Sequence, residues 1–354
     1  MSYTGKKLSI VTDYLNDYIR KNALENGARL PTESELIEHI GVSRVTLRRA
    51  LANMQEKKLI HSIQGSGYYV GELRACRTDT VPLIISYDHE NSKILNIVHG
   101  AQDYLNHRNC KVDVHISRRN PQTEREMITS LFEDGHQCII IFPVSSEDNI
   151  DFYFRMIQKG LKLVFIDRRP QFINCCSFVR SDNTTGGYLA AKHLIEQGHR
   201  NIVVFGLEPL MRTSASYERY YGYTMAMREY GLELPEQSYY YAPYRKCSDE
   251  VQKIFLSKNK ITAVFAINDH AAVDIATHAR SQGLTVPDDL AVIGFDNLDI
   301  TTIFTPHLST IDQPFTQLGE AAAEIAYKHI TKALDGYVQR VLPIELIVRE
   351  STRK

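Results

Sequence analysis

The first forty residues place apolar side chains three and four positions apart among polar ones, which is the period of a helix that buries one face. Between residues 8 and 24 this stripe consists of Leu8, Val11, Leu15, Tyr18 and Ile19. Gly27 interrupts the pattern, and Thr32 and Glu35 then stand at the spacing of a capping box. We therefore expect one amphipathic helix over residues 8–24 and a second over 33–40.

A third, basic helix is expected directly after a tight turn. Gly41 suits the left-handed residue that ends a helix, and Ser43 suits the N-cap of the next one. Its apolar stripe is Leu47, Ala50, Leu51 and Met54, and its polar residues include Arg44, Thr46, Arg48 and Arg49. A helix with one buried face and with arginine and hydroxyl groups near its N-terminus has the layout of a recognition helix in a DNA major groove. A surface helix with solvated charges would show the same pattern.

Two short strands, 59–63 and 68–70, flank a turn of sequence Gln64-Gly65-Ser66-Gly67. The two glycines could suggest a phosphate-binding loop, but a third glycine, a lysine and a following helix are missing, so a hairpin tip is favoured. The order helix, helix, turn, helix, hairpin predicts a winged helix-turn-helix domain over residues 1–72. The polar stretch 73–81 is then expected to be a linker.

From Pro82 onward, short apolar runs alternate with helical stretches. The runs are 83–87, 112–116, 138–142 and 163–166, and after Asp182 they resume near 201–206, 238–241, 262–266 and 291–295. Strands buried on both faces look like this, and their alternation with helices predicts doubly wound parallel sheets. We expect two α/β lobes within an effector-binding and dimerisation domain of residues 82–354. Lobe one would contain about 82–180 and 313–336, and lobe two about 182–311 and 338–354.

Polar residues follow three of these predicted strands. They are Asp167 and Arg168, Asn268 and Asp269, and Asp296 and Asn297. Ligands in such folds bind beyond the carboxyl ends of the strands, and a cleft between two lobes is a natural pocket. Carboxylates and amides at these positions suit a hydroxyl-rich ligand, whereas a single Asp after a strand is equally often a helix N-cap.

Charge is unevenly distributed along a chain whose formal net charge is only -1. Residues 39–71 hold five Lys or Arg and one acid, which fits a small basic DNA-binding domain on a neutral body. No run of 18 apolar residues and no secretory leader are visible, and the six cysteines form no C-x-x-C pair. We therefore expect a cytoplasmic protein with reduced thiols, no membrane partner, no metal and no cofactor.

Three segments near the N-terminus together resemble the DNA-binding head of GntR-family regulators. They are Leu30-Pro31-Thr-Glu33-Ser-Glu35-Leu36, Val42-Ser43-Arg44-x-Thr46-x-Arg48-x-Ala50-Leu51 and Gln64-Gly65-x-Gly67-x-x-Val70. The resemblance implies DNA contacts from Ser43, Arg44, Thr46 and Arg48 on the third helix and from Gln64 and Gly65 at the hairpin tip; Arg49 on the same helix is a further candidate. Ser34 occupies a position where some members of that family carry a DNA-contacting arginine.

The remainder of the chain resembles the effector-binding core of the LacI/GalR family. The matching segments are Phe165-Ile166-Asp167-Arg168, Ser181-Asp182-Asn183-x-x-Gly186-Gly187, His193-Leu194-Ile195-x-x-Gly198-His199-Arg200-x-Ile202, Arg219-x-x-Gly222-Tyr223, Asn268-Asp269, Val292-Ile293-Gly294-Phe295-Asp296-Asn297 and Leu308-Ser309-Thr310-Ile311-x-Gln313-Pro314-x-x-x-Leu318-Gly319. The resemblance implies a periplasmic-binding-protein-like fold, a homodimer and a small effector, usually a sugar. The effector contacts that it implies are Arg219, Asn268, Asp296, Asp167 and Gln313. Tyr87 and Tyr244 are candidates for stacking on a sugar face.

A GntR-type head on a LacI/GalR-type core is similar to the arabinose repressors of bacteria, and the hinge helix of the LacI/GalR head is absent. We therefore expect a transcriptional repressor of sugar-utilisation genes. Its affinity for double-stranded operator DNA would change when a monosaccharide, such as a pentose or deoxyhexose, binds. The alternatives are a solute-binding receptor, or a regulator that responds to a sugar phosphate or a purine. An enzyme is not expected, because the sequence shows no nucleophile elbow, P-loop or metal-ligand spacing.

Overall fold

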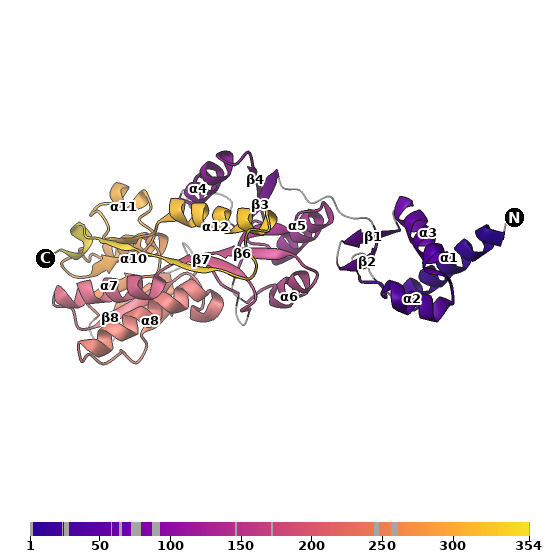
Figure 1. The fold of residues 1–354 in the computed structure, drawn as a ribbon. Coiled ribbons are helices and arrows are strands. Elements are labelled where there is room, and N and C mark those ends of the chain that lie inside the picture. Colours follow the sequence, from indigo (N-terminus) through magenta and orange to yellow (C-terminus); the bar gives the residue numbers. More distant parts are fainter. Residues whose placement is uncertain are drawn as a thin grey trace. The chain divides into compact units, whose positions relative to one another are not determined.

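The fold is described from a computed structural model, in which the chain divides into two compact units, Met1–Cys76 and Arg77–Lys354. Figure 1 shows the elements of both. The described residues are 3–22, 24, 28–57, 59–63, 66–71, 79–86, 93–145, 147–170, 173–243, 248–255 and 261–353. We call the first unit the head and the second the core, and each is described by itself.

The head consists of three helices and a hairpin. The helices are α1 (Tyr3–Lys21), α2 (Glu33–Ile40) and α3 (Arg44–Glu56), and the antiparallel strands are β1 (Ile60–Ile63) and β2 (Gly67–Val70). The apolar stripes pack together, with Val11, Leu15, Leu36, Leu47, Ala50, Leu51 and Met54 fully buried. This is the winged helix-turn-helix arrangement that the hydrophobic pattern predicts.

The local signals at the helix ends act as predicted. Thr32 and Glu35 form both bonds of the capping box at the start of α2, and Gly41 ends that helix with a left-handed φ of 70°. The Ser43 side chain accepts a hydrogen bond from the backbone N–H of Thr46 at the start of α3. Gly27 lies outside the described residues, and α1 ends at Lys21, three residues before the predicted end.

The first lobe of the core is built on a six-stranded parallel sheet, with strand order β13-β7-β6-β5-β3-β4. These strands are β3 (Thr80–Ile85), β4 (Lys111–Ile116), β5 (Cys138–Phe142), β6 (Lys162–Ile166), β7 (Ser177–Ser181) and β13 (Gln339–Leu342). Helices α4 (Ile94–Asn106) and α12 (Phe315–Ile330) pack with one apolar cluster of the sheet. Helices α5 (Pro121–Glu133) and α6 (Ile150–Gln158) pack with the other.

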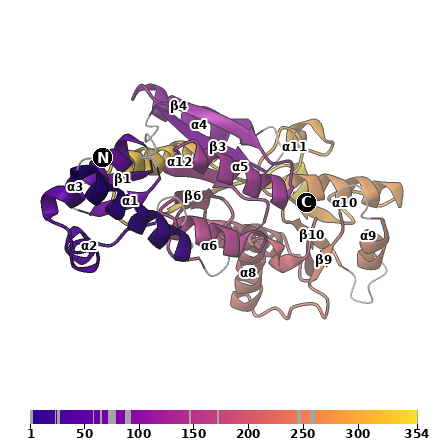
Figure 2. The ribbon, with the colours of Figure 1, turned by 90° about the vertical axis from the view of Figure 1, so that its right-hand side faces the viewer.

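The second lobe has a four-stranded parallel sheet of order β11-β10-β8-β9. Its strands are β8 (Ile202–Gly206), β9 (Tyr239–Tyr241), β10 (Ala263–Ala266) and β11 (Ala291–Ile293). Helices α7 (Asn183–Glu196) and α8 (Ser214–Glu229) cover one face. Helices α9 (Ser248–Phe255) and α10 (Asp269–Ser281) lie side by side over the other, as Figure 2 shows, and the short α11 (Ile300–Ile303) follows β11.

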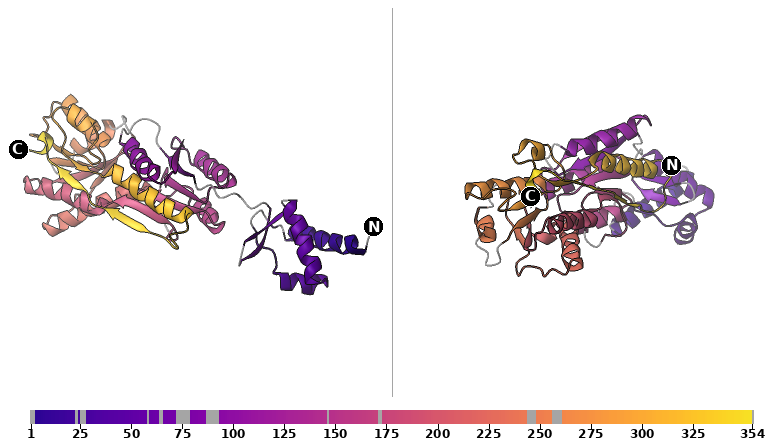
Figure 3. Two further views of the ribbon diagram at one scale, coloured as in Figure 1. Left: turned by 45° about the horizontal axis from the view of Figure 1, so that its top comes forward. Right: turned by 90° about the vertical axis from the view of Figure 1, so that its left-hand side faces the viewer.

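The lobes are joined where the chain passes from β7 to α7, from β12 (Thr310–Asp312) to α12, and from β13 to β14 (Glu345–Ile347). β14 pairs antiparallel with β12, and Figure 3 shows the C-terminal strands running from one lobe into the other. The sequence-based assignment of 338–354 to lobe two is therefore wrong for β13, which pairs with β7 of the first sheet. The residues of β13 alternate between exposed and half-buried, as in a strand at the edge of a sheet. Such a strand lacks the continuous apolar run of a buried strand and is therefore difficult to distinguish from a loop in the sequence.

Candidate functional site

The recognition-helix candidates lie as expected on the outer side of α3. Arg44, Arg48 and Arg49 are exposed, Thr46 is half-buried, and the stripe that includes Leu47 and Leu51 is buried beneath them. Arg48 is held by α2, because its Nε donates to both carboxylate oxygens of Glu33 at 3.2 and 3.1 Å. A guanidinium anchored through Nε keeps its terminal nitrogens for another acceptor, such as a base edge or phosphate. Gln64 and Gly65 lie outside the described residues.

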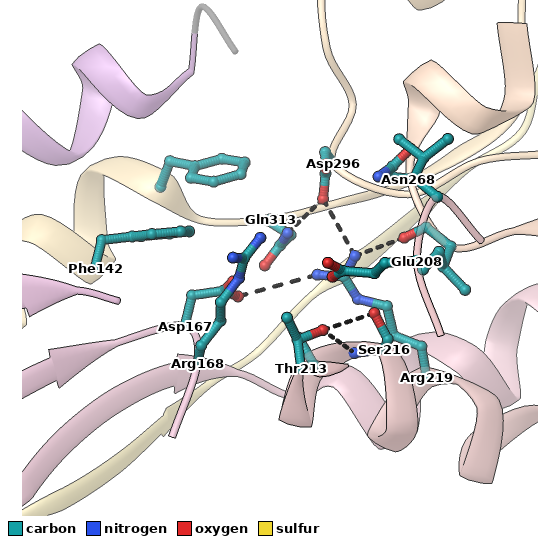
Figure 4. Close-up of a pocket in the computed structure, with 14 residues that line it drawn as sticks. Phe142, Asp167, Arg168, Glu208, Thr213, Ser216, Arg219, Asn268, Asp296 and Gln313 are labelled. Carbon is teal, nitrogen blue, oxygen red and sulfur yellow. Dashed lines mark hydrogen bonds and ion pairs between the residues drawn. The ribbon is translucent and has the colours of Figure 1, made fainter. Parts of the chain in front are cut away.

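A pocket lies between the two lobes of the core, at the carboxyl ends of their strands (Figure 4). It contains about 490 Å³ of space between atoms, part of which is open solvent. The first lobe contributes Phe142, Asp167 and Arg168, and Phe315 begins α12. The remaining lining residues are Leu207, Glu208, Thr213, Ala215, Ser216, Arg219, Ile267, Asn268, Asp296 and Gln313.

Arg219 is placed in the pocket by a close crossing of α7 and α8. A Cβ atom on Gly187 would lie 1.9 Å from the Arg219 backbone oxygen, so only glycine allows this approach. The Arg219 guanidinium lies 3.7 Å from the centre of the Phe295 ring, donates from Nε to Asn183 Oδ1 at 2.8 Å and donates from Nη1 to the Ile267 carbonyl at 2.6 Å. Its position is therefore set by the protein alone.

Two carboxylates face this guanidinium from opposite lobes. Asp296 Oδ1 lies 3.6 Å from Nη1 of Arg219, and Asp167 Oδ1 lies 4.0 Å from Nη2 (Figure 4). Burial raises the pKa of Asp296 to about 6, although Arg219 and a hydrogen bond from Gln313 lower it. The ionised form of Asp296 is therefore stabilised by Arg219 and Gln313, and a ligand that donates a hydrogen bond would stabilise it further.

Asp269, at the start of α10, holds the loop that carries Asp296 in place through hydrogen bonds. Asp269 Oδ2 accepts from the backbone N–H of Leu298 and Oδ1 accepts from the Thr310 hydroxyl, both at 2.7 Å. Burial, and next the nearby Asp296 carboxylate, raise the pKa of Asp269 well above its usual value. The hydrogen bonds of Asp269 therefore tie α10, the loop after β11 and β12 into one frame beneath the pocket.

Two buried acceptors in the pocket have no hydrogen-bond partner among the described residues. They are Oδ1 of Asp167 and Oε1 of Gln313, and both side chains line the pocket. A buried acceptor without a donor costs free energy, which a ligand with hydroxyl or N–H groups would recover. The pocket therefore favours a hydrogen-bond donor as its ligand.

The structure brings together five of the seven predicted effector residues, which are Arg219, Asn268, Asp296, Asp167 and Gln313. Asn268 is both a pocket residue and a helix N-cap, the two roles that its sequence position allowed. It lines the pocket, and its side chain accepts a hydrogen bond from the backbone N–H of Ala271 at the start of α10. Tyr87 and Tyr244 lie outside the described residues. In the part of the chain that the structure describes, the aromatic rings at the pocket are those of Phe142 and Phe315.

Sequence reasoning missed five of the polar and aromatic lining residues, which are Phe142, Glu208, Thr213, Ser216 and Phe315. It placed Arg168 at a strand end but did not name it among the effector contacts. Phe142 ends β5, so the strand-end rule could have found it as well. Thr213 and Ser216 form the N-terminal cap of α8, a local pattern that gives no sign of a pocket.

Family models match the head and part of the core. Residues 9–70 match the family model for bacterial regulatory proteins of the gntR family, and residues 191–352 match that for the periplasmic binding protein-like domain. The chain joins a GntR-type DNA-binding head to a periplasmic-binding-protein-like core. This confirms the expected fold class, α/β with a winged helix-turn-helix head and a core of two doubly wound lobes.

Curated relatives span nearly the whole chain. The arabinose metabolism transcriptional repressor of Geobacillus stearothermophilus is 28% identical over 352 residues, covering 95% of each protein. The HTH-type transcriptional repressor PurR of Photobacterium profundum is 25% identical over 342 residues, covering 92% of this chain and 99% of its own.

Solved structures share the fold of the core. The structure described as a transcriptional regulator CelR-cellobiose complex has a TM-score of 0.71 at 24% identity and covers 88% of this chain and 91% of its own. A LacI family transcriptional regulator from Enterococcus faecium with bound ribose has a TM-score of 0.65 at 24% identity and covers 77% of this chain and 98% of its own. Within the described residues of this chain, no helix could cross a membrane, and no group of three or more metal-ligating side chains is found.

Proposed function

We propose that this chain is a bacterial transcriptional repressor whose affinity for operator DNA changes when a monosaccharide binds between the lobes of its core. The winged helix-turn-helix domain predicted over residues 1–72 would bind DNA, and a homodimer would place two α3 helices in successive major-groove turns of a roughly palindromic site. The match of the head to gntR-family regulators and the likeness of the whole chain to named repressors support this function.

The observation that carries the sugar assignment is the pair of unsatisfied acceptors beside Arg219. Asp167 Oδ1 and Gln313 Oε1 need donors, and the hydroxyl groups of a sugar supply them. The Phe142 and Phe315 rings line the same pocket and offer apolar faces to the C–H side of a sugar ring. A pentose or deoxyhexose combines both features.

The charges of the pocket disfavour a sugar phosphate. Its lining holds three carboxyl side chains, Asp167, Glu208 and Asp296, but only two guanidinium groups, Arg168 and Arg219. Both guanidinium groups already donate to backbone carbonyls within the protein. A dianionic phosphate would therefore face excess negative charge. A purine would stack on the phenylalanines, and it is the competing ligand, since relatives named PurR are similar to this chain.

Regulation requires that the ligand bind one arrangement of the lobes better than another. A sugar that contacts Asp167 on the first lobe and Asp296 on the second favours the arrangement in which both are close to Arg219. We expect this arrangement to weaken operator binding, so that the sugar acts as inducer.

The test of the pocket is a thermal-shift panel of monosaccharides, sugar phosphates and purine bases on the purified protein. A ligand at 100 times its dissociation constant adds about 2.7 kcal/mol to the free energy of unfolding, which gives a visible shift. A monosaccharide should stabilise the wild-type protein but not Asp167→Asn, while Asp103→Asn on the exposed side of α4 responds normally. Stabilisation by purines or sugar phosphates alone would refute the sugar assignment and leave the DNA-binding function standing.

The test of the head is operator binding, measured on a genomic fragment that the wild-type protein selects. Arg44→Ala and Arg48→Ala should each abolish specific binding with little change in melting temperature, because both side chains are exposed and an ion pair as solvated as Arg48–Glu33 contributes little to stability. Full binding by both variants would show that α3 is not the recognition helix.

A further inference from the structure

Beside the pocket, but outside its lining, an ion pair joins the two lobes. Arg212 belongs to the short 3-10 turn Leu210–Arg212 of the second lobe, and its guanidinium donates from Nη2 to Oδ2 of Asp148, which precedes α6 in the first lobe. Arg212 Nη1 also lies 3.9 Å from Glu147 Oε2. Close by, the backbone N–H of Arg169 donates across the same boundary to the Ser214 hydroxyl at 2.9 Å.

The Asp148 side of this pair is rigidly connected to the pocket. Ser145 donates to the Asp148 carboxylate at 2.9 Å and accepts from its backbone N–H at 2.8 Å, which closes a tight turn. The turn rests on the fully buried Glu124, which accepts from the N–H of Val144 at 3.1 Å. The carbonyl of Val144 in turn accepts from the guanidinium of Arg168, a pocket-lining residue.

The Arg212 side is connected to the opposite wall. The next residue, Thr213, is buried, lines the pocket and caps α8, the helix that carries Arg219. Leu207, Glu208 and Ser216 of the same segment line the pocket as well. A movement of either wall would therefore change the distance between Arg212 and Asp148.

We propose that Arg212 and Asp148 form a latch that biases the two lobes toward the arrangement enclosing the effector, which makes both of them positioning residues for effector binding. This inference rests on the proposed function. Neither Arg212 nor Asp148 lines the pocket, so we expect the latch to act through the equilibrium between open and closed lobes. Its side chains are 37% and 27% exposed, so its contribution is that of a partly solvated pair. We expect its loss to weaken effector affinity about fivefold, equivalent to ~1 kcal/mol.

The experiment compares Arg212→Gln and Asp148→Asn with the matched control Arg228→Gln, which removes one exposed positive charge from the last turn of α8. Calorimetric titrations with L-arabinose and D-ribose should show about fivefold weaker binding in both latch variants, wild-type binding in the control, and partial rescue in Arg212→Lys. The difference from wild type should shrink in 1 M NaCl, because salt screens a partly exposed ion pair. A loss of affinity that is independent of salt would indicate a packing defect and overturn the latch.

Hydrogen exchange without any sugar gives an independent measurement. In both latch variants, amide exchange should accelerate in the peptides that contain Val144 to Asp148 and Leu207 to Ser216, and it should stay at the wild-type rate in Arg228→Gln. Wild-type exchange together with wild-type affinity would overturn the latch while leaving the proposed function intact. If wild-type protein binds neither pentose, the sugar assignment is in doubt, and the exchange rates alone decide whether the latch exists.

Discussion

The ionisation of Asp296 should make effector binding depend on pH. Burial is the main cause that raises the pKa of this carboxyl from 3.8 to about 6, and the carboxylate of Asp167 adds to the shift. A sugar hydroxyl that donates to Asp296 binds the ionised form more tightly, since charge-assisted hydrogen bonds are about twice as strong as neutral ones. Affinity should therefore rise as the pH rises through 6.

The size of the effect follows from the ionised fraction. With a pKa near 6, about one tenth of the Asp296 carboxyls are ionised at pH 5 and nearly all at pH 7.5, so sugar affinity should be lower at pH 5 by at most about tenfold, the limit in which only the ionised form binds. The contribution of Asp296 to the free energy of unfolding should change in the opposite direction and decrease as the pH rises. An acid whose pKa is higher in the folded protein than in the unfolded chain binds its proton more tightly when folded. The contribution of Asp296 to stability is therefore greatest below pH ~4 and declines as the pH rises from ~4 to ~6.

Isothermal titration calorimetry at pH 5, 6, 7 and 8 measures the first effect, with the sugar identified by the thermal-shift panel. Asp296→Asn keeps the shape of the side chain but cannot ionise, so its weaker affinity should not change with pH between 5 and 8. A wild-type affinity that is equally flat would show that the ionisation of Asp296 is not coupled to sugar binding in this range, and the prediction would then be wrong.

Three further predictions concern a helix crossing, a helix cap and two buried thiols. Gly187→Ala should lower the free energy of unfolding by ~1–3 kcal/mol in denaturant titrations and weaken sugar binding, because the new Cβ would collide with the Arg219 carbonyl and displace α8; unchanged stability would show that the helix crossing can relax. Thr32→Ala should remove the capping box of α2 and destabilise the head by about 1 kcal/mol, while sugar binding by the core stays at the wild-type level in calorimetry. Burial raises the pKa of the Cys176 thiol to about 12 and also raises that of Cys138, so mass spectrometry after iodoacetamide treatment of the native protein at pH 8 should find both unmodified; rapid alkylation would mean that the structure around these thiols opens readily.

The sequence predicted most of the head because its signals are local. Thr32, Gly41 and Ser43 each act within a few residues of themselves, and the α3 stripe needs only the helical period. The arrangement of the core strands also followed from their alternation with helices. The edge strand β13 did not, because its half-polar pattern reflects exposure at the side of a sheet that is formed mainly by residues more than 150 positions earlier.

The pocket could be predicted only in part, for a different reason. Asp167, Asn268 and Asp296 follow strands and were found by position, whereas Thr213 and Phe315 lie at the starts of helices and enter the pocket because the two lobes face each other. The pairing of Arg48 with Glu33 was equally hidden, since it joins two helices through side chains fifteen residues apart. Contacts of this kind depend on the angle between elements, which no local pattern specifies.

Backbone conformation adds an argument that the strand ends of the core serve ligand binding rather than stability. Asp167 has a φ of 65° and Asp296 a φ of 109°, in a region that non-glycine residues seldom occupy. The two residues follow strands of different lobes, and both carboxylates face Arg219. Glycine would adopt either conformation without strain, so an aspartate at each position lowers the stability of the fold. Asp167 lowers it further, because its buried Oδ1 has no hydrogen-bond donor. Such strain is typical of ligand-binding positions, where the bound molecule supplies the missing hydrogen bond.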